Sequence, residues 1–185
     1  MYRFLSIVLT VVVLFGCSQQ NDQMDKVLIL RNSIVNSNGC AFDVTITADY
    51  LDSYHTFGMR CISDEIGNVT FEIIEPNSIS GITGIVTSED GKLTFDDQVL
   101  LFPTIAEDLL TPVSAPWFFL KSLKSGYIRG CGMDSGLTLL QIDDSYSDNV
   151  IKMNVQIIDG VPIFAEIIWQ DRCIVTMEVR EFHIL

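Results

Sequence analysis

The chain has 185 residues, of which 24 are acidic and 11 are lysine or arginine, so its formal net charge is −13. This length suits a single domain with a sizeable core. A nucleic-acid-binding surface needs clustered lysine and arginine, so we expect no nucleic-acid partner. A hydrophobic content of 48% also excludes a disordered chain, because such chains are poor in large apolar residues.

The first 17 residues have the pattern of an export signal. Arg3 precedes a largely apolar run that is shorter than the ~20 residues of a membrane-spanning helix. The run ends in Leu14-Phe15-Gly16-Cys17, which resembles the lipobox of bacterial lipoproteins. This resemblance implies a signal peptide at 1–16 and a diacylglyceryl anchor on Cys17. It also implies a location on the extracytoplasmic face of the cell membrane. The alternatives are an ordinary signal peptide with an incidental Cys17, or a short uncleaved anchor.

The mature chain is expected to begin with a tether and a helix. Residues 17–23 are mostly polar, which is typical of a flexible tether. Met24, Val27, Leu30 and Ile34 then recur at helical spacing and predict a helix of about four turns. Turn-forming residues at 36–39 end it. We therefore predict one domain that spans residues 24–185.

From residue 40 onward the pattern changes to strands. Apolar and polar residues alternate with period two over 40–50, which predicts a half-buried strand. Further strands are predicted near 57–61, 69–73, 83–88, 92–96, 98–102, 126–131, 137–143, 149–158, 161–170 and 173–182. Residues 104–110 are predicted as one or two helical turns, and a second helix runs from about Pro116 to Gly126.

These elements predict a mainly β (α+β) fold. We expect a strongly curved antiparallel sheet, or incomplete β-barrel, of about ten to eleven strands. Two or three helices would cover its concave face. The apolar residues Pro116, Phe119, Leu120 and Leu123 lie on one side of the second helix, which would face the sheet.

Several segments resemble the LolA-like superfamily of lipoprotein carriers and surface lipoproteins, in particular small Firmicutes lipoproteins. They are an N-terminal helix followed by the strand 42–48, the strand Phe71-Glu72-Ile73-Ile74-Glu75-Pro76, the segments 79–83 and 93–95, and a helical insertion at 104–125. The resemblance implies an incomplete barrel whose helices cover an apolar cavity that holds an acyl chain. Members with unrelated roles share this scaffold.

The residue types that carry catalysis or bind metals are sparse. His55 and His183 stand apart from any nucleophile or acid in a recognisable arrangement, and Gly130-Cys131-Gly132 is more typical of a strand than of a phosphate loop. The acidic segment 143–149 lacks the glycine and distal glutamate of a calcium loop. We therefore expect no enzyme, no cofactor and no metal site.

Four cysteines, Cys40, Cys61, Cys131 and Cys173, remain beside Cys17, and none forms a Cys-x-x-Cys pair. We favour buried thiols, with a disulfide as the alternative, because an exported chain can oxidise them.

Trp117 and Phe118 fall outside the apolar side of the second helix. They either pack under a loop or contact a ligand. The candidate ligand-binding residues are Phe42, Val44, Ile46, Phe71, Ile73, Trp117, Phe118 and Leu120.

Two functions are consistent with the sequence. The first is an anchored lipoprotein that binds a lipid, an acyl group or another hydrophobic ligand. The second is a surface-tethered interaction or sensor module, with a cavity filled by side chains and an unknown protein partner.

Overall fold

The computed structural model describes residues 22–49, 53–103, 105–106, 109–146 and 150–185. The predicted signal peptide and Cys17 lie outside these residues. Within the described part of the chain, no helix is both long and apolar enough to cross a bilayer.

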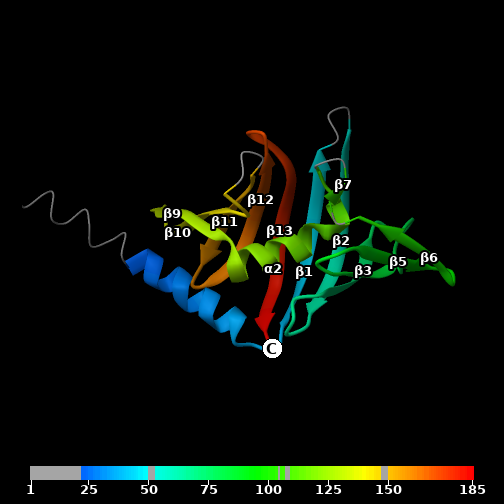
Figure 1. Ribbon diagram of the computed structural model, residues 1–185, viewed down its shortest axis with the longest axis horizontal. Helices are drawn as coiled ribbons and strands as arrows, with labels where there is room; N and C mark the ends of the chain where they lie inside the picture. The colour runs from blue at the N-terminus through cyan, green and yellow to red at the C-terminus, as the bar shows by residue number, and fades with distance from the viewer. Residues whose placement is uncertain (1–21, 50–52, 104, 107–108, 147–149) are drawn as a thin grey trace, which may run out of the picture.

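Eleven strands form one antiparallel sheet (Figure 1). In spatial order they are β6 (Gln98–Phe102), β5 (Gly91–Phe95), β4 (Thr83–Val86), β3 (Val69–Glu75), β2 (Tyr54–Ser63), β1 (Cys40–Asp49), β13 (Arg172–Ile184), β12 (Val161–Trp169), β11 (Ile151–Ile158), β10 (Leu137–Asp143) and β9 (Tyr127–Asp134). Apart from the central β1–β13 pair, neighbours in the sheet are consecutive along the chain.

The central strand β1 shows how the sequence separates the two faces of the sheet. Its buried residues, from Cys40 to Ala48, alternate with half-buried ones from Ala41 to Asp49. Successive side chains of a strand point to opposite faces, so this alternation directs the apolar side chains toward the helices. Asp43, Thr45 and Thr47 lie on the other face, where Arg60 pairs with Asp43 at 3.3 Å.

Two-residue turns with positive φ close several hairpins. The turn Asp159-Gly160, with φ of 50° and 80°, joins β11 to β12. The turn Gln170-Asp171, with φ of 49° and 60°, joins β12 to β13, which begins at Arg172.

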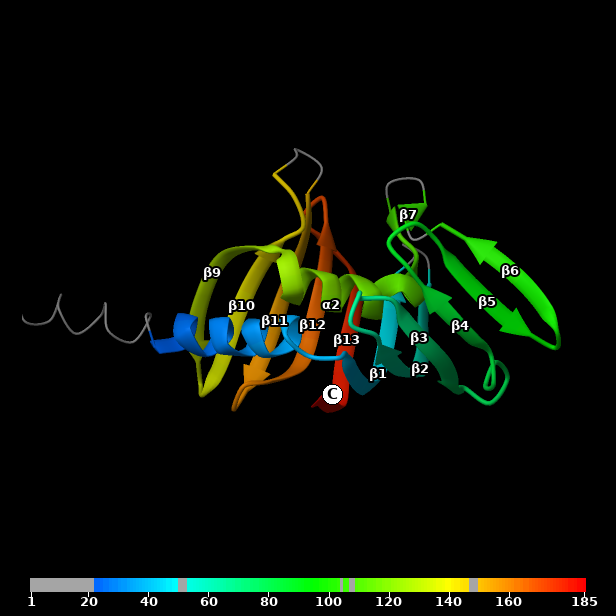
Figure 2. The ribbon, with the colours of Figure 1, turned by 60° about the horizontal axis from the view of Figure 1, so that its bottom comes forward.

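Both α-helices lie on the same face of the sheet (Figure 2). The N-terminal helix, described over residues 22–35, covers the half formed by β9 to β12. A 3₁₀ turn, η1 (Pro112–Ser114), leads into α2 (Ala115–Ser125), which crosses the middle of the sheet. Arg31 joins the helices, since its Nε donates a hydrogen bond to the carbonyl oxygen of Leu123 at 2.8 Å.

An aromatic cluster fixes α2 on the centre of the sheet. The ring centroids of Phe119 and Phe42 are 5.9 Å apart, and those of Phe119 and Phe182 are 6.4 Å apart. Both contacts have edge-to-face geometry, which is favourable for aromatic pairs. Phe42 lies on β1 and Phe182 on β13, so one helical side chain bridges the two central strands.

The predicted fold class is confirmed: one antiparallel sheet carries two α-helices on one face. The sheet is open, because β6 and β9 are its two edges, and it does not curl as strongly as we predicted.

Two local predictions are wrong. Within 104–110, Ile105 pairs with Leu110 and Ala106 with Leu109, so the segment is a hairpin of β7 (Ile105–Ala106) and β8 (Leu109–Leu110) and not helical turns. A segment this short gains few helical hydrogen bonds after the unfavourable nucleation step. The predicted tether, 17–23, also overlaps the N-terminal helix, to which Asp22 and Gln23 belong.

Candidate functional site

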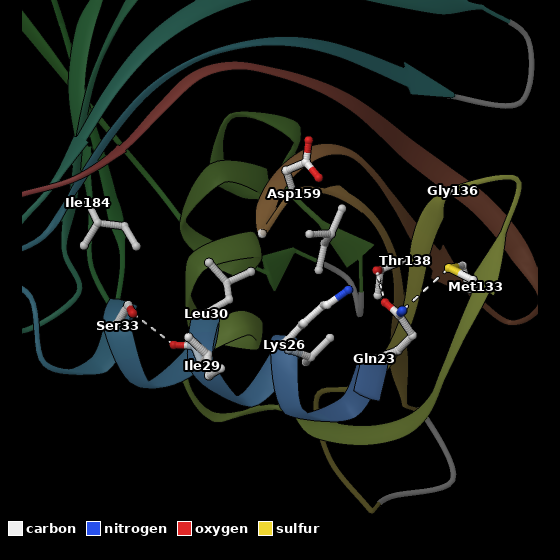
Figure 3. Close-up of a pocket in the computed structure, with 13 residues that line it drawn as sticks. Gln23, Lys26, Ile29, Leu30, Ser33, Met133, Gly136, Thr138, Asp159 and Ile184 are labelled. Carbon is white, nitrogen blue, oxygen red and sulfur yellow. Dashed lines mark hydrogen bonds between the residues drawn. The ribbon is translucent and has the colours of Figure 1, made fainter. Parts of the chain in front are cut away.

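A pocket of about 470 Å³ lies between the N-terminal helix and the sheet, beside β9, β10 and β11 (Figure 3). This volume is within the range of about 300–1,000 Å³ that is typical of small-molecule sites. The lining residues are Gln23, Lys26, Val27, Ile29, Leu30, Ser33, Met133, Gly136, Thr138, Ile157, Asp159, Gly160 and Ile184.

The N-terminal helix forms this pocket because it carries two overlapping stripes. Val27, Leu30 and Ile34 are spaced three or four residues apart, and each is at most 6% exposed in the core. A neighbouring stripe of Lys26, Ile29, Leu30 and Ser33 faces the pocket. Leu30 belongs to both stripes, so the core and the pocket share one wall.

Apolar side chains remain exposed at the mouth of the pocket. Ile29 is 66% exposed, Met133 is 49% exposed and Ile184 is 40% exposed. They come from the N-terminal helix, from β9 and from β13. A ligand that covers them would remove apolar surface from water, which is the main source of affinity for hydrophobic molecules.

A buried hydrogen bond fixes the start of the helix against β10. Thr138 Oγ1 donates to Gln23 Oε1 at 2.7 Å, and the two residues are 8% and 5% exposed. Gln23 Nε2 also lies 3.6 Å from Met133 Sδ on β9. A buried amide needs such partners, and here they hold the pocket's end wall in place (Figure 3).

Lys26 and Asp159 are the charged members of the lining. Lys26 extends from the helix across the pocket, whereas Asp159 comes from the β11–β12 turn (Figure 3). The ammonium group supplies a positive charge on a chain with a net charge of −13. The lining therefore combines one charge of each sign with its apolar side chains.

A second pocket, of about 320 Å³, lies beside α2. Trp117 and Leu120 line it together with Lys121 and Lys124. The Lys121 ammonium lies 5.2 Å from the centroid of the Trp117 ring, a cation–π contact that orients the indole. Trp117 is only 7% exposed, so the ring mostly packs inward.

The eight candidate ligand-binding residues are brought together in one hydrophobic core. Each is at most 7% exposed: Phe42, Val44, Ile46, Phe71, Ile73, Trp117, Phe118 and Leu120. Their role as ligand contacts stays a prediction, and the predicted anchor Cys17 is outside the described residues.

The wall of the pocket under the N-terminal helix was not predicted from the sequence. One signal was available, because the helix has more apolar residues than its core stripe needs. Leu28, Ile29 and Val35 are 47%, 66% and 52% exposed. The contributions from β9 to β11 required the strand register, which the sequence does not specify between distant hairpins.

The four described cysteines are free thiols; Cys40, Cys61 and Cys131 are buried, as we favoured, whereas Cys173 is half-buried. Burial raises the pKa of Cys61 strongly, and burial is also the main cause that raises the pKa of Cys40, Cys131 and Cys173. A thiol with a raised pKa is protonated at neutral pH and is a poor nucleophile. Cys40, Cys61 and Cys131 therefore act as core residues.

The histidines do not form part of a described site. His55 and His183 are both exposed, and Ser53 Oγ lies 3.1 Å from His55 Nε2. Among the described residues, no group of three or more histidine, cysteine, aspartate or glutamate side chains is arranged to hold a metal ion.

Solved structures with a similar fold cover most of this chain. A DUF1329 family protein from Desulfovibrio piger matches 90% of this chain and 93% of its own, at 8% identity and a TM-score of 0.51. A LolA superfamily protein from Nitrosomonas europaea matches 86% of this chain and 93% of its own, at 10% identity and a TM-score of 0.48. A chain in the complex of the CwlD amidase and the GerS lipoprotein from Clostridioides difficile matches 84% of this chain and 91% of its own. The sequence identity is 13% and the TM-score is 0.47.

The solved structures that this chain resembles thus include a LolA superfamily protein, as the sequence resemblance predicted. At these low identities the likeness concerns the fold alone. No protein-family model matches the chain, and no curated protein matches it.

Proposed function

We propose that this chain is a lipid-anchored protein of the bacterial cell envelope that binds a hydrophobic ligand, without catalysis, in the pocket under the N-terminal helix. The observation that carries the proposal is the 470 Å³ pocket, whose lining is mainly apolar and whose mouth exposes Ile29, Met133 and Ile184. A lipid or acyl group is the ligand class that this lining favours, and Lys26 favours an anionic end.

The expected affinity comes from apolar burial. Each methylene group removed from water contributes ~0.8 kcal/mol, so ten buried methylenes give ~8 kcal/mol before the costs of association. The shape of the pocket would set selectivity, because its polar side chains are few: Lys26, Asp159, Ser33, Gln23 and Thr138, of which the last two already bond to each other.

The proposed anchor and the pocket belong to the same end of the chain. Cys17 precedes Gln23 by six residues, which span at most ~20 Å when fully extended. A diacylglyceryl group on Cys17 would therefore keep the pocket within reach of the membrane surface. Two acyl chains hold a protein stably where one holds it only marginally. A Cys17→Ala variant should leave the membrane fraction or remain unprocessed, and unchanged fractionation and mass would contradict the anchor.

The ligand site is tested by filling the pocket in the full-length chain. Ser33 is an exposed helix residue that lines the pocket, so Ser33→Trp should occupy it without disturbing the core. Leu28→Trp is the matched control, since Leu28 is 47% exposed on the same helix and outside the lining. We expect uptake of a fluorescent fatty acid to weaken at least tenfold in Ser33→Trp alone.

The results of this uptake experiment distinguish a ligand in the pocket from a ligand among the core residues. Equal uptake by both variants and the parent chain, or no uptake and no extractable lipid in the parent, would contradict the pocket proposal. Uptake that survives Ser33→Trp but disappears in Trp117→Ala would place the ligand beside α2, among the residues that the sequence predicted.

A protein-interaction role is the second candidate. It is favoured by a specific observation, the apolar surface of the β5–β6 hairpin, where Val99, Leu100 and Leu101 are 55–66% exposed. A chain that takes up no lipid but assembles through this hairpin would support that role alone.

A further inference from the structure

The β5–β6 hairpin exposes apolar side chains at an open edge of the sheet. Phe95 is 50% exposed, Val99 55%, Leu100 62% and Leu101 66%. Within the described residues, β6 pairs only with β5. Figure 2 shows this hairpin at the end of the sheet, beyond both helices.

Edge strands of stable monomers usually carry a charged residue, a proline or a bulge that prevents pairing with another chain. The strand β6, Gln98–Phe102, contains no charged residue and no proline, and its pairing with β5 has no register shift. The opposite edge differs, because β9 contains Arg129, Asp134 and two glycines. Of the two edges, β6 is therefore the one suited to accept a further strand.

The hairpin register determines which backbone groups face outward. Asp96 and Asp97 form a two-residue turn, with φ of 45° and 60°, that is closed by the pair Phe95 and Gln98. In such a hairpin the closing pair exchanges hydrogen bonds, and bonded pairs then alternate with non-bonded ones. Leu100 therefore bonds to Leu93, while the N–H and C=O groups of Val99 and Leu101 face the open edge.

We propose that β6 pairs antiparallel with β6 of a second copy of this chain, about a two-fold axis at Leu100. In this register Val99 of each copy lies opposite Leu101 of the other, and the four outward N–H groups all find carbonyl partners. Leu100 and its equivalent form the central non-bonded pair, whose side chains lie closest together.

Three features favour a second copy as the occupant. The strand is self-complementary about Leu100, and no charged residue is brought opposite another. The turn carboxylates of Asp96 and Asp97 extend past Phe102 of the other copy. Phe71, Gly84, Leu93 and Leu100 are also in register across the sheet, so the apolar face continues to the paired edges without a charged residue.

The interface is small, because one five-residue strand and a few side chains form it. We expect it to belong to the weak class that buries less than ~1,200 Å² in total. Each copy has a net charge of −13, so added salt should strengthen the dimer by screening their repulsion. The inference does not depend on the ligand pocket, which lies at the other end of the sheet.

The test uses cysteine crosslinking of the full-length chain in detergent-solubilised membranes. A Leu100→Cys variant places two thiols across the axis, within the Cβ separation of a non-bonded pair, and mild oxidation should give a covalent dimer. Ile62→Cys is the matched control, since Ile62 is 52% exposed on the interior strand β2. The parent chain measures any background from its native cysteines.

A second change tests strand pairing itself. Leu101→Pro removes one N–H that faces the open edge and leaves the bonds to β5 in place. In the Leu100→Cys background it should reduce the covalent dimer at least fivefold. Absence of a dimer in Leu100→Cys, equal crosslinking of Ile62→Cys, a yield that Leu101→Pro does not reduce, or a crosslink only to a different protein would each overturn the proposal.

Discussion

The two helices cover neighbouring parts of one sheet in different ways. α2 buries eight of its eleven residues, including Trp117, Phe118, Phe119 and Leu120. The N-terminal helix buries four of the fourteen residues described, and it leaves a pocket against the sheet. The same face therefore supports a packed core under one helix and an open cavity under the other. Stability and ligand binding should accordingly respond to mutations in different helices.

Core substitutions should show the largest difference between the two helices. Phe119→Ala removes a fully buried ring that contacts Phe42 and Phe182, and should lower the free energy of unfolding by about 3–5 kcal/mol. Leu30→Ala should cost about 2 kcal/mol, because one side of Leu30 already faces the pocket. Urea unfolding, followed by the fluorescence of Trp117 and Trp169, measures both. Equal losses would show that the N-terminal helix is packed as tightly as α2.

The Gln23–Thr138 hydrogen bond should contribute less to the free energy of unfolding than the Phe119 ring does. It should have a larger effect on the shape of the pocket. Thr138→Val leaves the buried Gln23 oxygen without its donor, which should cost about 2 kcal/mol and loosen the end wall. The double variant Gln23→Leu/Thr138→Val should recover part of that loss, because neither polar group is then left unpaired. A double variant whose loss equals the sum of the two single losses would show that the bond carries no coupling.

The comparison also shows which features the sequence could predict. The period-two alternation in β1 and the apolar side of α2 are local patterns, so the strands and the α2 helix were located correctly. The 104–110 hairpin was missed because its two strands are only two residues long and are defined by their pairing, Ile105 with Leu110 and Ala106 with Leu109, and not by a pattern along the chain. The pocket was missed for the same reason, since Thr138 and Ile157 meet Lys26 only through the fold.

The buried thiols predict that the free energy of unfolding depends on pH. Burial raises the pKa of Cys61 in the folded chain, whereas an unfolded thiol ionises at about pH 8.5. The stabilisation that the protonated Cys61 thiol contributes is therefore fully present below that pH and is lost as the pH rises above it. Near pH 9.5 this single group should contribute a slope of about 1.4 kcal/mol per pH unit. Cys61→Ala should be less stable at neutral pH but have a shallower alkaline slope, and an unchanged slope would contradict this account.

The smallest predicted effect concerns the contact that joins the two helices. Arg31→Met keeps the apolar stem but removes the donors to the carbonyl oxygens of Leu123 and Ser122, at 2.8 and 3.4 Å. Because a cation at a helix C-terminus is favourable, we expect a loss of about 1 kcal/mol. Arg60→Met is the control, since it breaks an exposed ion pair with Asp43 and should cost less than about 0.5 kcal/mol.

The same variant should change ligand kinetics more than stability. Without the Arg31 contact, the N-terminal helix can separate from the sheet while α2 stays packed, so a bound fatty acid should dissociate several times faster. Stopped-flow displacement of a fluorescent fatty acid measures this rate in Arg31→Met, Arg60→Met and the parent chain. Identical rates in all three would mean that the ligand leaves without movement of the N-terminal helix. The pocket would then be a preformed opening, and the distinction between a packed helix and a movable one would concern stability alone.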